Sequence, residues 1–204
     1  MPMWNDLVDV ASAVRICEDC ALSQGRTNAV PGDGNASSTI MFIGEGPGFH
    51  EDVQGLPFVG QAGQLLNDLL AEIGLKREDV YITNVVKCRP PDNRDPQPDE
   101  IGECSKYLDR QIELIDPRVI VTLGRFSMDR FFPGQRISKI HGMPRSIGRR
   151  TVLPMYHPAA ALHQPSLRQT LSDDFAKIRV AAEAVQDAPA EDDRDDTERQ
   201  LSLF

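Results

Sequence analysis

The chain has 204 residues, of which 40% are hydrophobic and 26% charged, and its formal net charge is −9. This length can form one sizeable hydrophobic core, and the composition excludes collagen, a coiled coil and a fully disordered chain. No apolar run approaches the roughly 18 residues of a membrane helix, and the first residues lack the basic and apolar segments of a signal peptide. We therefore expect a cytoplasmic protein without a membrane partner.

The negative charge is concentrated at the carboxyl end of the chain. Residues 187–204 hold seven acidic residues against two arginines, so they carry −5 of the net charge. Alanine and proline are also frequent there, and such a composition cannot bury an apolar core. We expect one folded domain over residues 1–186, followed by a disordered acidic tail. Inside the domain a basic interval either contacts phosphate or forms a solvated loop, and it contains Lys139, Arg145, Arg149 and Arg150.

Helical and strand patterns alternate along the domain. The expected helices cover residues 4–14, 65–73, 99–115, 126–132 and 167–185. The expected strands cover residues 39–43, 80–86, 119–123 and 151–155, and residues 23–38 are expected as a loop. This alternation predicts a three-layer α/β/α fold with a central, mainly parallel four-stranded sheet.

Ligands of parallel sheets bind beyond the carboxyl ends of the strands. Three polar segments follow strands here, at residues 44–48, 84–88 and 157–161, and their convergence predicts one pocket. The first is rich in glycine but lacks the Gly-x-Gly-x-x-Gly spacing, and no Gly-Lys-Ser/Thr follows, so dinucleotide and triphosphate binding are disfavoured. Its backbone N–H groups can still approach a ligand closely, although a plain turn is the alternative.

Four cysteines in a chain without a signal peptide favour metal, cluster or catalytic use over disulfides. Cys17 and Cys20 have the Cys-x-x-Cys spacing of a redox pair or half a zinc site. Cys88 and Cys104 lack the short second spacing of a zinc ribbon, whereas four thiolates suit a 4Fe-4S cluster. Zinc and free buried cysteines remain alternatives.

Four motifs in this order resemble the family 4 uracil-DNA glycosylases. They are GEGPGFHED at residues 44–52, PFVG at 57–60, YITNVVKCRPP at 81–91 and HPAA at 157–160. The resemblance extends over about residues 4–185. These bacterial and archaeal enzymes carry an iron-sulfur cluster, so the resemblance implies that all four cysteines hold a 4Fe-4S cluster with a structural role or a role in shaping the DNA surface.

The resemblance also implies which residues bind a flipped uracil. Phe58 stacks on the ring, and Asn84 reads the edge, because its amide matches the N3–H donor and O4 acceptor of uracil. Glu51 fills the space that would admit the 5-methyl group of thymine, next to Gly48, where other families have a tyrosine. The alternatives are an ordinary core position for Phe58 and a turn position for Asn84.

Bond cleavage leaves negative charge on the departing base, so donors aimed at uracil O2 should dominate catalysis. The resemblance assigns this donor to His157, with help from the backbone N–H groups around Gly46, although a histidine before proline is more often structural. Gly46 stands where the best-known uracil-DNA glycosylases have an aspartate. Glu45 is the expected residue for placing the attacking water, with a purely structural carboxylate as the alternative. We expect His141 and Arg145 to contact the DNA backbone.

The last five residues resemble the peptide with which bacterial repair proteins dock on the DNA sliding clamp. The docking residues would be Gln200, Leu201, Leu203 and Phe204, and an apolar end without a partner is the alternative.

The sequence as a whole predicts a monomeric, monofunctional glycosylase that removes uracil from single- or double-stranded DNA and leaves an abasic site. Two alternatives are a uracil-recognising DNA-binding or clamp-associated module with little catalysis, and a zinc hydrolase of free deoxyuridine nucleotides. No lysine is placed as an obvious Schiff-base nucleophile, so strand cleavage is not expected.

Overall fold

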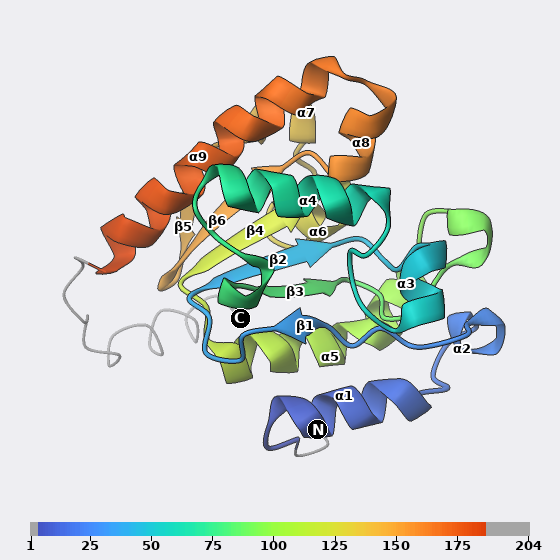
Figure 1. Cartoon of the computed structure of the whole chain (residues 1–204). Coiled ribbons are helices and arrows are strands. Elements are labelled where there is room, and N and C mark those ends of the chain that lie inside the picture. Colours follow the sequence, from blue (N-terminus) through green and yellow to red (C-terminus); the bar gives the residue numbers. More distant parts are fainter. Residues whose placement is uncertain (1–3, 187–204) are drawn as a thin grey trace.

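The computed structural model of the protein describes residues 4–186 (Figure 1). The expected acidic tail and the clamp-docking peptide fall in residues 187–204 and lie outside the described residues. Within the described range, no helix combines the length and apolar character needed to cross a membrane.

A six-stranded sheet forms the centre of the fold. In the order β1-β3-β2-β4-β6-β5, its strands are Asp33–Gly34, Tyr81–Asn84, Ile40–Gly44, Val119–Leu123, Arg150–Met155 and Arg145–Ile147. The inner four strands are parallel, and β1 and β5 pair antiparallel at the two edges. All four predicted strands are therefore present as the parallel centre. The edge strands were not predicted, because two or three residues are too few to form an apolar run.

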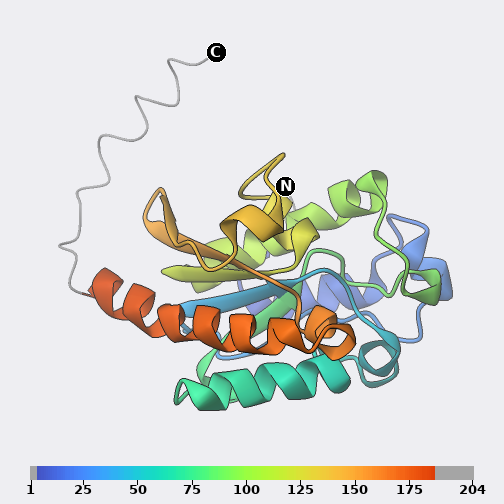
Figure 2. The ribbon, with the colours of Figure 1, turned by 90° about the horizontal axis from the view of Figure 1, so that it is seen from above.

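Helices cover both faces of the sheet, as the sequence predicted (Figure 2). On one face α1 (Leu7–Ile16) packs on α5 (Pro98–Ile115), and on the other α4 (Gln61–Glu72) packs on α9 (Ser166–Gln186). Successive side chains of β2 point to opposite faces, so the sheet separates two apolar clusters. Met41 and Ile43 join the cluster under α1 and α5, whereas Ile40 and Phe42 join the cluster under α4 and α9.

Short helices connect these layers. They are α2 (Leu22–Gly25), α3 (Phe49–Gln54), α6 (Arg125–Asp129), α7 (Ile137–Ile140) and α8 (Pro158–His163), with the 3-10 turns η1 (Arg77–Asp79) and η2 (Pro91–Asn93). Only α6 was predicted, over residues 126–132, and it is shorter than expected; the other four were not predicted, because four to six residues show too little periodicity. Two of them matter for the site, because α3 follows the loop after β2 and α8 follows β6 directly. Both therefore begin at the carboxyl ends of parallel strands, where a ligand is expected.

Candidate active site

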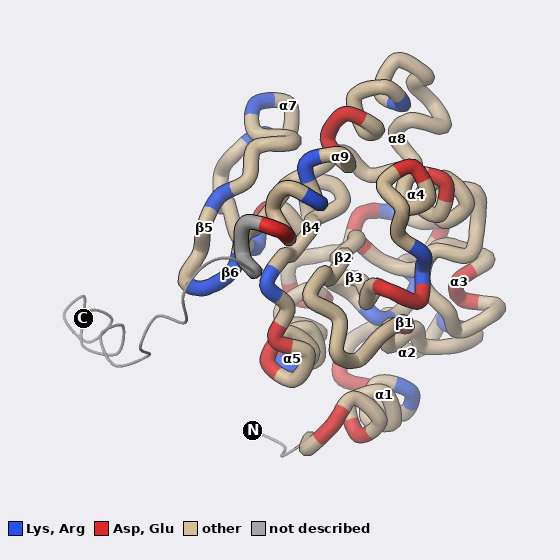
Figure 3. Tube along the Cα trace, turned by 60° about the vertical axis from the view of Figure 1, so that its left-hand side comes forward, with Lys and Arg blue, Asp and Glu red and all other residues tan. Residues whose placement is uncertain are grey.

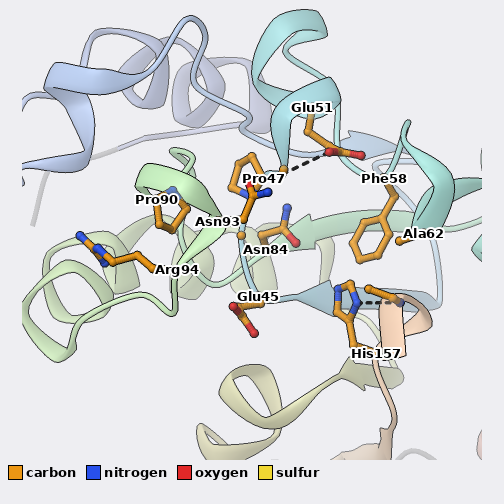
Figure 4. Close-up of a pocket in the computed structure, with 13 residues that line it drawn as sticks. Glu45, Pro47, Glu51, Phe58, Ala62, Asn84, Pro90, Asn93, Arg94 and His157 are labelled. Carbon is orange, nitrogen blue, oxygen red and sulfur yellow. Dashed lines mark hydrogen bonds between the residues drawn. The ribbon is translucent and has the colours of Figure 1, made fainter. Parts of the chain in front are cut away.

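A cavity of about 360 Å³ opens at the carboxyl ends of β2, β3 and β6 (Figure 4). Its walls are formed by Glu45, Gly46, Pro47, Gly48, Glu51, Phe58, Ala62, Asn84, Pro90, Asn93, Arg94, His157 and Ala159. The structure thus brings together in one cavity all six residues to which the sequence assigned uracil binding or catalysis. They come from separate loops, and only the parallel sheet makes them neighbours.

Asn84 ends β3 and is 2% exposed. Its side-chain oxygen is buried and has no hydrogen-bond partner among the described residues. A buried amide oxygen without a partner costs free energy unless a ligand supplies a donor. Gly44 makes room for this amide, because a Cβ at that position would lie 2.4 Å from Asn84 Oδ1 and 2.7 Å from the Phe58 ring.

A buried lysine supports the backbone of Asn84. Lys87 is 1% exposed, and its Nζ donates to Asn84 O at 2.8 Å, to Thr83 Oγ1 at 2.6 Å and to Gln111 Oε1 at 2.7 Å. Gln111 lies on α5, so the lysine ties that helix to the end of β3. Sequence reasoning missed this group, because a lysine after a strand usually points to solvent.

Phe58 and His157 stack on each other, with ring centroids 5.5 Å apart and planes 25° apart. Phe58 has a left-handed backbone, with φ of 52°. Arg77 holds this strained residue by donating to its carbonyl oxygen at 3.0 Å and also to the carbonyl oxygen of Pro57. Gly63 of α4 packs so closely that a Cβ there would lie 1.9 Å from Phe58 O. The ring is therefore fixed by backbone contacts on two sides.

The His157 imidazole is prepared as a neutral donor. Its Nδ1 accepts the backbone N–H of Ala159 at 3.1 Å, so the proton of the neutral ring is on Nε2. Removal from water lowers the pKa of His157 to about 4, although the Glu51 carboxylate opposes this shift. At neutral pH the ring is uncharged and can donate one hydrogen bond from Nε2.

Glu51 organises the loops beside the cavity. Its carboxylate accepts backbone N–H groups from Gly48 at 3.2 Å and from Val59 and Gly60 at 2.8 Å each. It thereby caps α3 and fixes the chain before α4. A Cβ on Gly48 would lie 2.8 Å from Glu51 Oε2, so this carboxylate occupies the space that a side chain at Gly48 would need.

Glu45 follows β2 and is half-buried at the cavity wall. Burial raises the pKa of its carboxyl group, the charge of Asp95 raises it further, and Arg125 opposes both. Gly46 comes next, and a Cβ there would lie 2.8 Å from a methyl carbon of Val86. The absence of a side chain thus lets the backbone of this loop lie against the chain that leaves β3.

The loop after β3 supplies residues that the sequence did not indicate. Pro90, Asn93 and Arg94 line the cavity, although no site role was assigned to any of them from the sequence. Asn93 has a left-handed backbone, with φ of 54°, and its Oδ1 accepts from Arg89 Nε at 2.8 Å. No pattern of periodicity or spacing marks such a turn residue as part of a site.

The four cysteines line a second, small cavity beside α1, β3 and α5. Cys17 and Cys20 are half-buried there, and Cys88 and Cys104 are buried. Burial raises the pKa of Cys104 to about 12 and raises that of Cys88, so bound metal charge would be needed to hold both as thiolates. Across residues 4–186, however, no three His, Cys, Asp or Glu side chains already stand in a metal-binding arrangement.

His141 and Arg145 do not line the cavity. His141 Nδ1 lies 2.7 Å from the buried carboxylate of Asp174 on α9, and the Arg145 guanidinium lies over the Phe132 ring. Figure 3 shows Lys and Arg along α7, β5 and β6, but both Arg149 and Arg150 bind Asp116. The expected DNA contacts on this side stay predictions.

Comparisons with known proteins agree with this geometry. The profile of the Uracil DNA glycosylase superfamily matches residues 31–182. The chain is 52% identical over 182 residues to a type-4 uracil-DNA glycosylase of Saccharolobus solfataricus, covering 84% of each chain. It is 49% identical over 183 residues to that of Archaeoglobus fulgidus (85% of this chain and 92% of the relative) and 47% identical over 181 residues to that of Thermotoga maritima (86% and 94%). The chain therefore belongs to the uracil-DNA glycosylase superfamily and, within it, to the type-4 uracil-DNA glycosylases.

Proposed function

We propose that the protein is a monofunctional glycosylase that flips uracil out of DNA into this cavity, hydrolyses its N-glycosidic bond and leaves an abasic site. The observation that carries the proposal is the amide oxygen of Asn84, which has no partner within residues 4–186 and shares a cavity with the Phe58 ring and the His157 imidazole. A base inside a duplex cannot reach such a cavity without leaving the stack.

Asn84 selects the base. Its Oδ1 accepts N3–H of uracil, and its amide N–H group donates to O4. Cytosine presents an unprotonated N3 and an amino group at these positions, so it would leave both groups of the asparagine without a partner. Phe58 supplies the stacking surface, and Glu51 closes the space beside C5, where thymine carries a methyl group.

His157 stabilises the leaving group. As the bond from C1′ to N1 breaks, negative charge develops on uracil O2, and the Nε2–H of the neutral imidazole donates to it. One such preorganised donor contributes a factor of about 10² to 10³ in kcat. Backbone N–H groups near Gly46 share this task.

Glu45 places the water that attacks C1′. The sugar carries positive charge once uracil has largely departed, so a weak base is sufficient and a nearby carboxylate also stabilises the sugar. The amide of Asn93 is a second polar group at the same cavity and can help to hold the water.

The cysteine cavity fits a 4Fe-4S cluster, because its donor set is four thiols and two of the sulfurs already accept N–H donors. Arg26 donates to Cys88 Sγ at 3.1 Å, and the Lys87 backbone N–H donates to Cys104 Sγ at 3.3 Å. Cys17, Cys20, Cys88 and Cys104 would hold the cluster, whose contribution is a cross-link between the end of α1, the chain after β3 and α5. Zinc is the alternative, and the two differ in visible absorption and in iron and sulfide content.

Contacts with two partners, DNA and the sliding clamp, are proposed from the sequence alone. His141 and Arg145 would touch the DNA backbone outside the cavity, and the residues Gln200, Leu201, Leu203 and Phe204 would dock on the sliding clamp. Removal of residues 200–204 should abolish clamp binding and leave uracil release from short oligonucleotides unchanged.

Uracil release from a labelled oligonucleotide tests the main proposal. The wild type should release uracil and leave an alkali-labile abasic site without cutting the strand itself. If the wild type binds uracil-containing DNA in an Asn84-dependent manner but releases no base, the protein is a uracil-recognising module instead.

A further inference from the structure

The outer face of α3 carries exposed apolar side chains beside the cavity. Phe49 is 55% exposed, Val53 is 50% exposed, and Leu56, just after the helix, is 41% exposed. Their spacing of four and three residues places them on one side, whereas Glu51 and Asp52 of the same helix are buried. The proposed mechanism uses none of the three apolar side chains.

Contacts place the Phe49 ring near the residues that line the cavity. The Arg89 guanidinium carbon lies 5.3 Å from the ring centroid, and Arg89 Nε donates to Asn93 Oδ1 at 2.8 Å. Asn93 lines the cavity, as does Gly48, which precedes Phe49 in the chain. The ring is thus connected to the lining residue Asn93 through the Arg89 side chain, and the Phe49 backbone directly follows the lining residue Gly48.

Binding sites for single-stranded nucleic acids combine exposed aromatic rings with neighbouring cations, and Phe49 and Arg89 provide one of each. Bases stack on aromatic side chains without regard to sequence, and a neighbouring cation binds the phosphate. Arg89 is half-buried and held in place by the Asn93 oxygen, so its position is fixed before DNA arrives.

We propose that Phe49 and Arg89 form a subsite for the nucleotide next to the flipped uracil, with its base stacked on Phe49 and its phosphate paired with Arg89. This rests on the proposed function, because a strand whose uracil occupies the cavity must continue past the mouth. In a duplex the neighbouring base is already stacked and paired, so the subsite favours single-stranded substrate.

Steady-state uracil release from single-stranded oligonucleotides tests the subsite. In one oligonucleotide natural bases flank the uracil, and in two others the nucleotide on the 5′ or the 3′ side is an abasic tetrahydrofuran. Phe49→Ala removes the ring and Phe49→Tyr keeps it. Val180→Ala is the matched control, because Val180 is a 66% exposed apolar residue on α9.

We expect Phe49→Ala to raise KM on the natural oligonucleotide about fivefold or more, the smallest loss typical of one stacked base. An abasic nucleotide on one side of the uracil should raise the KM of the wild type and of Phe49→Tyr, also by about fivefold or more. The KM of Phe49→Ala should not change with this substrate. Val180→Ala should match the wild type throughout. For Arg89→Gln, the slope of log KM against log salt should fall by about 0.7, as for the loss of one contact to a single-strand phosphate.

The proposal is overturned if the KM of Phe49→Ala equals that of the wild type on every oligonucleotide. It is also overturned if the KM of Phe49→Ala exceeds that of the wild type by the same factor on all three oligonucleotides. Binding of an oligonucleotide that contains 2′-fluoro-2′-deoxyuridine, measured by fluorescence anisotropy, separates this outcome from a failure of the proposed function. Phe49-dependent binding without uracil release would leave the subsite standing and reject the glycosylase.

Discussion

The rings of Phe58 and His157 stack with their centroids 5.5 Å apart, although one residue precedes α4 and the other follows β6. This contact joins the stacking surface for the base to the donor for the leaving group. It also keeps water from one face of the imidazole, which contributes to the low pKa of His157. One contact therefore serves both binding and catalysis.

The pKa of His157 predicts how stability depends on pH. The folded-state value of about 4 lies below the ordinary 6.5, so between these values the unfolded chain binds a proton that the folded chain does not. The stability of the wild type should therefore fall as pH falls from 6.5 to 4. His157→Asn should lack this loss, so relative to the wild type it should gain on the order of 2 kcal/mol between pH 7.5 and pH 4.5 in urea unfolding. An equal slope for both proteins would show that the imidazole is not desolvated.

Replacement of Asn84 separates binding from stability. Asn84→Ala should reduce kcat/KM for uracil release about a hundredfold or more, because it removes the only groups assigned to reading the base edge. Its free energy of unfolding should change little, since no hydrogen bond to the Oδ1 is lost. Thr122→Val is the matched control, because Thr122 Oγ1 on β4 is also buried without a partner in the described part of the chain but does not line the cavity. Full activity in Asn84→Ala would reject the assigned role.

Removal of the Lys87 amino group should disturb the position of Asn84. Lys87→Met leaves the carbonyl oxygen of Asn84 without this donor, which costs about 1–3 kcal/mol of stability by chemical unfolding. It should also lower kcat/KM at least tenfold at a temperature where the variant is fully folded, because Asn84 loses its backbone support. Lys106→Met, which removes a partly exposed ion pair with Asp19, should change neither quantity appreciably. Wild-type kinetics in folded Lys87→Met would make the lysine purely structural.

Two glycine substitutions test the space around the cavity. Gly44→Ala should lower activity by about two orders of magnitude, because the new methyl group collides with Asn84 Oδ1 and the Phe58 ring. Gly102→Ala should instead stabilise the protein by roughly 0.5–1 kcal/mol with unchanged activity, because it lies on α5 and no atom of residues 4–186 comes within 4 Å of the new Cβ. Uracil release and thermal unfolding should be measured for both variants. Equal activity of Gly44→Ala and Gly102→Ala would contradict the cavity geometry.

The proposed cluster predicts a visible absorption band and bound iron and sulfide. Cys104→Ser should lose the band and lower the melting temperature, because Cys104 would no longer help to cross-link α5 to the chain after β3. Anaerobic purification followed by metal analysis checks this expectation. Zinc without sulfide in the wild type would replace the cluster by the alternative.

The sequence predicted the inner strands and long helices because each of them carries enough apolar residues to show a period. It also predicted that the segments after β2, β3 and β6 meet, since the carboxyl ends of parallel strands share one edge. The residues that other parts of the chain bring next to those segments could not be predicted. Asn93 reaches the cavity through a left-handed turn, and Lys87 is buried because Gln111 and Thr83 happen to face it. Such positions depend on contacts between distant segments, which no local pattern records.

The two edges of the sheet have a consequence for behaviour at high concentration. An unpaired strand edge invites a second molecule to add a strand, which is a common start of aggregation. Here β1 is only two residues long, and β5 is a three-residue strand that begins with an exposed arginine, Arg145. A molecule that approached either edge would find few backbone groups to pair with, and at β5 it would also meet positive charge. The fold is thereby protected against intermolecular sheet extension at both ends of an otherwise apolar sheet.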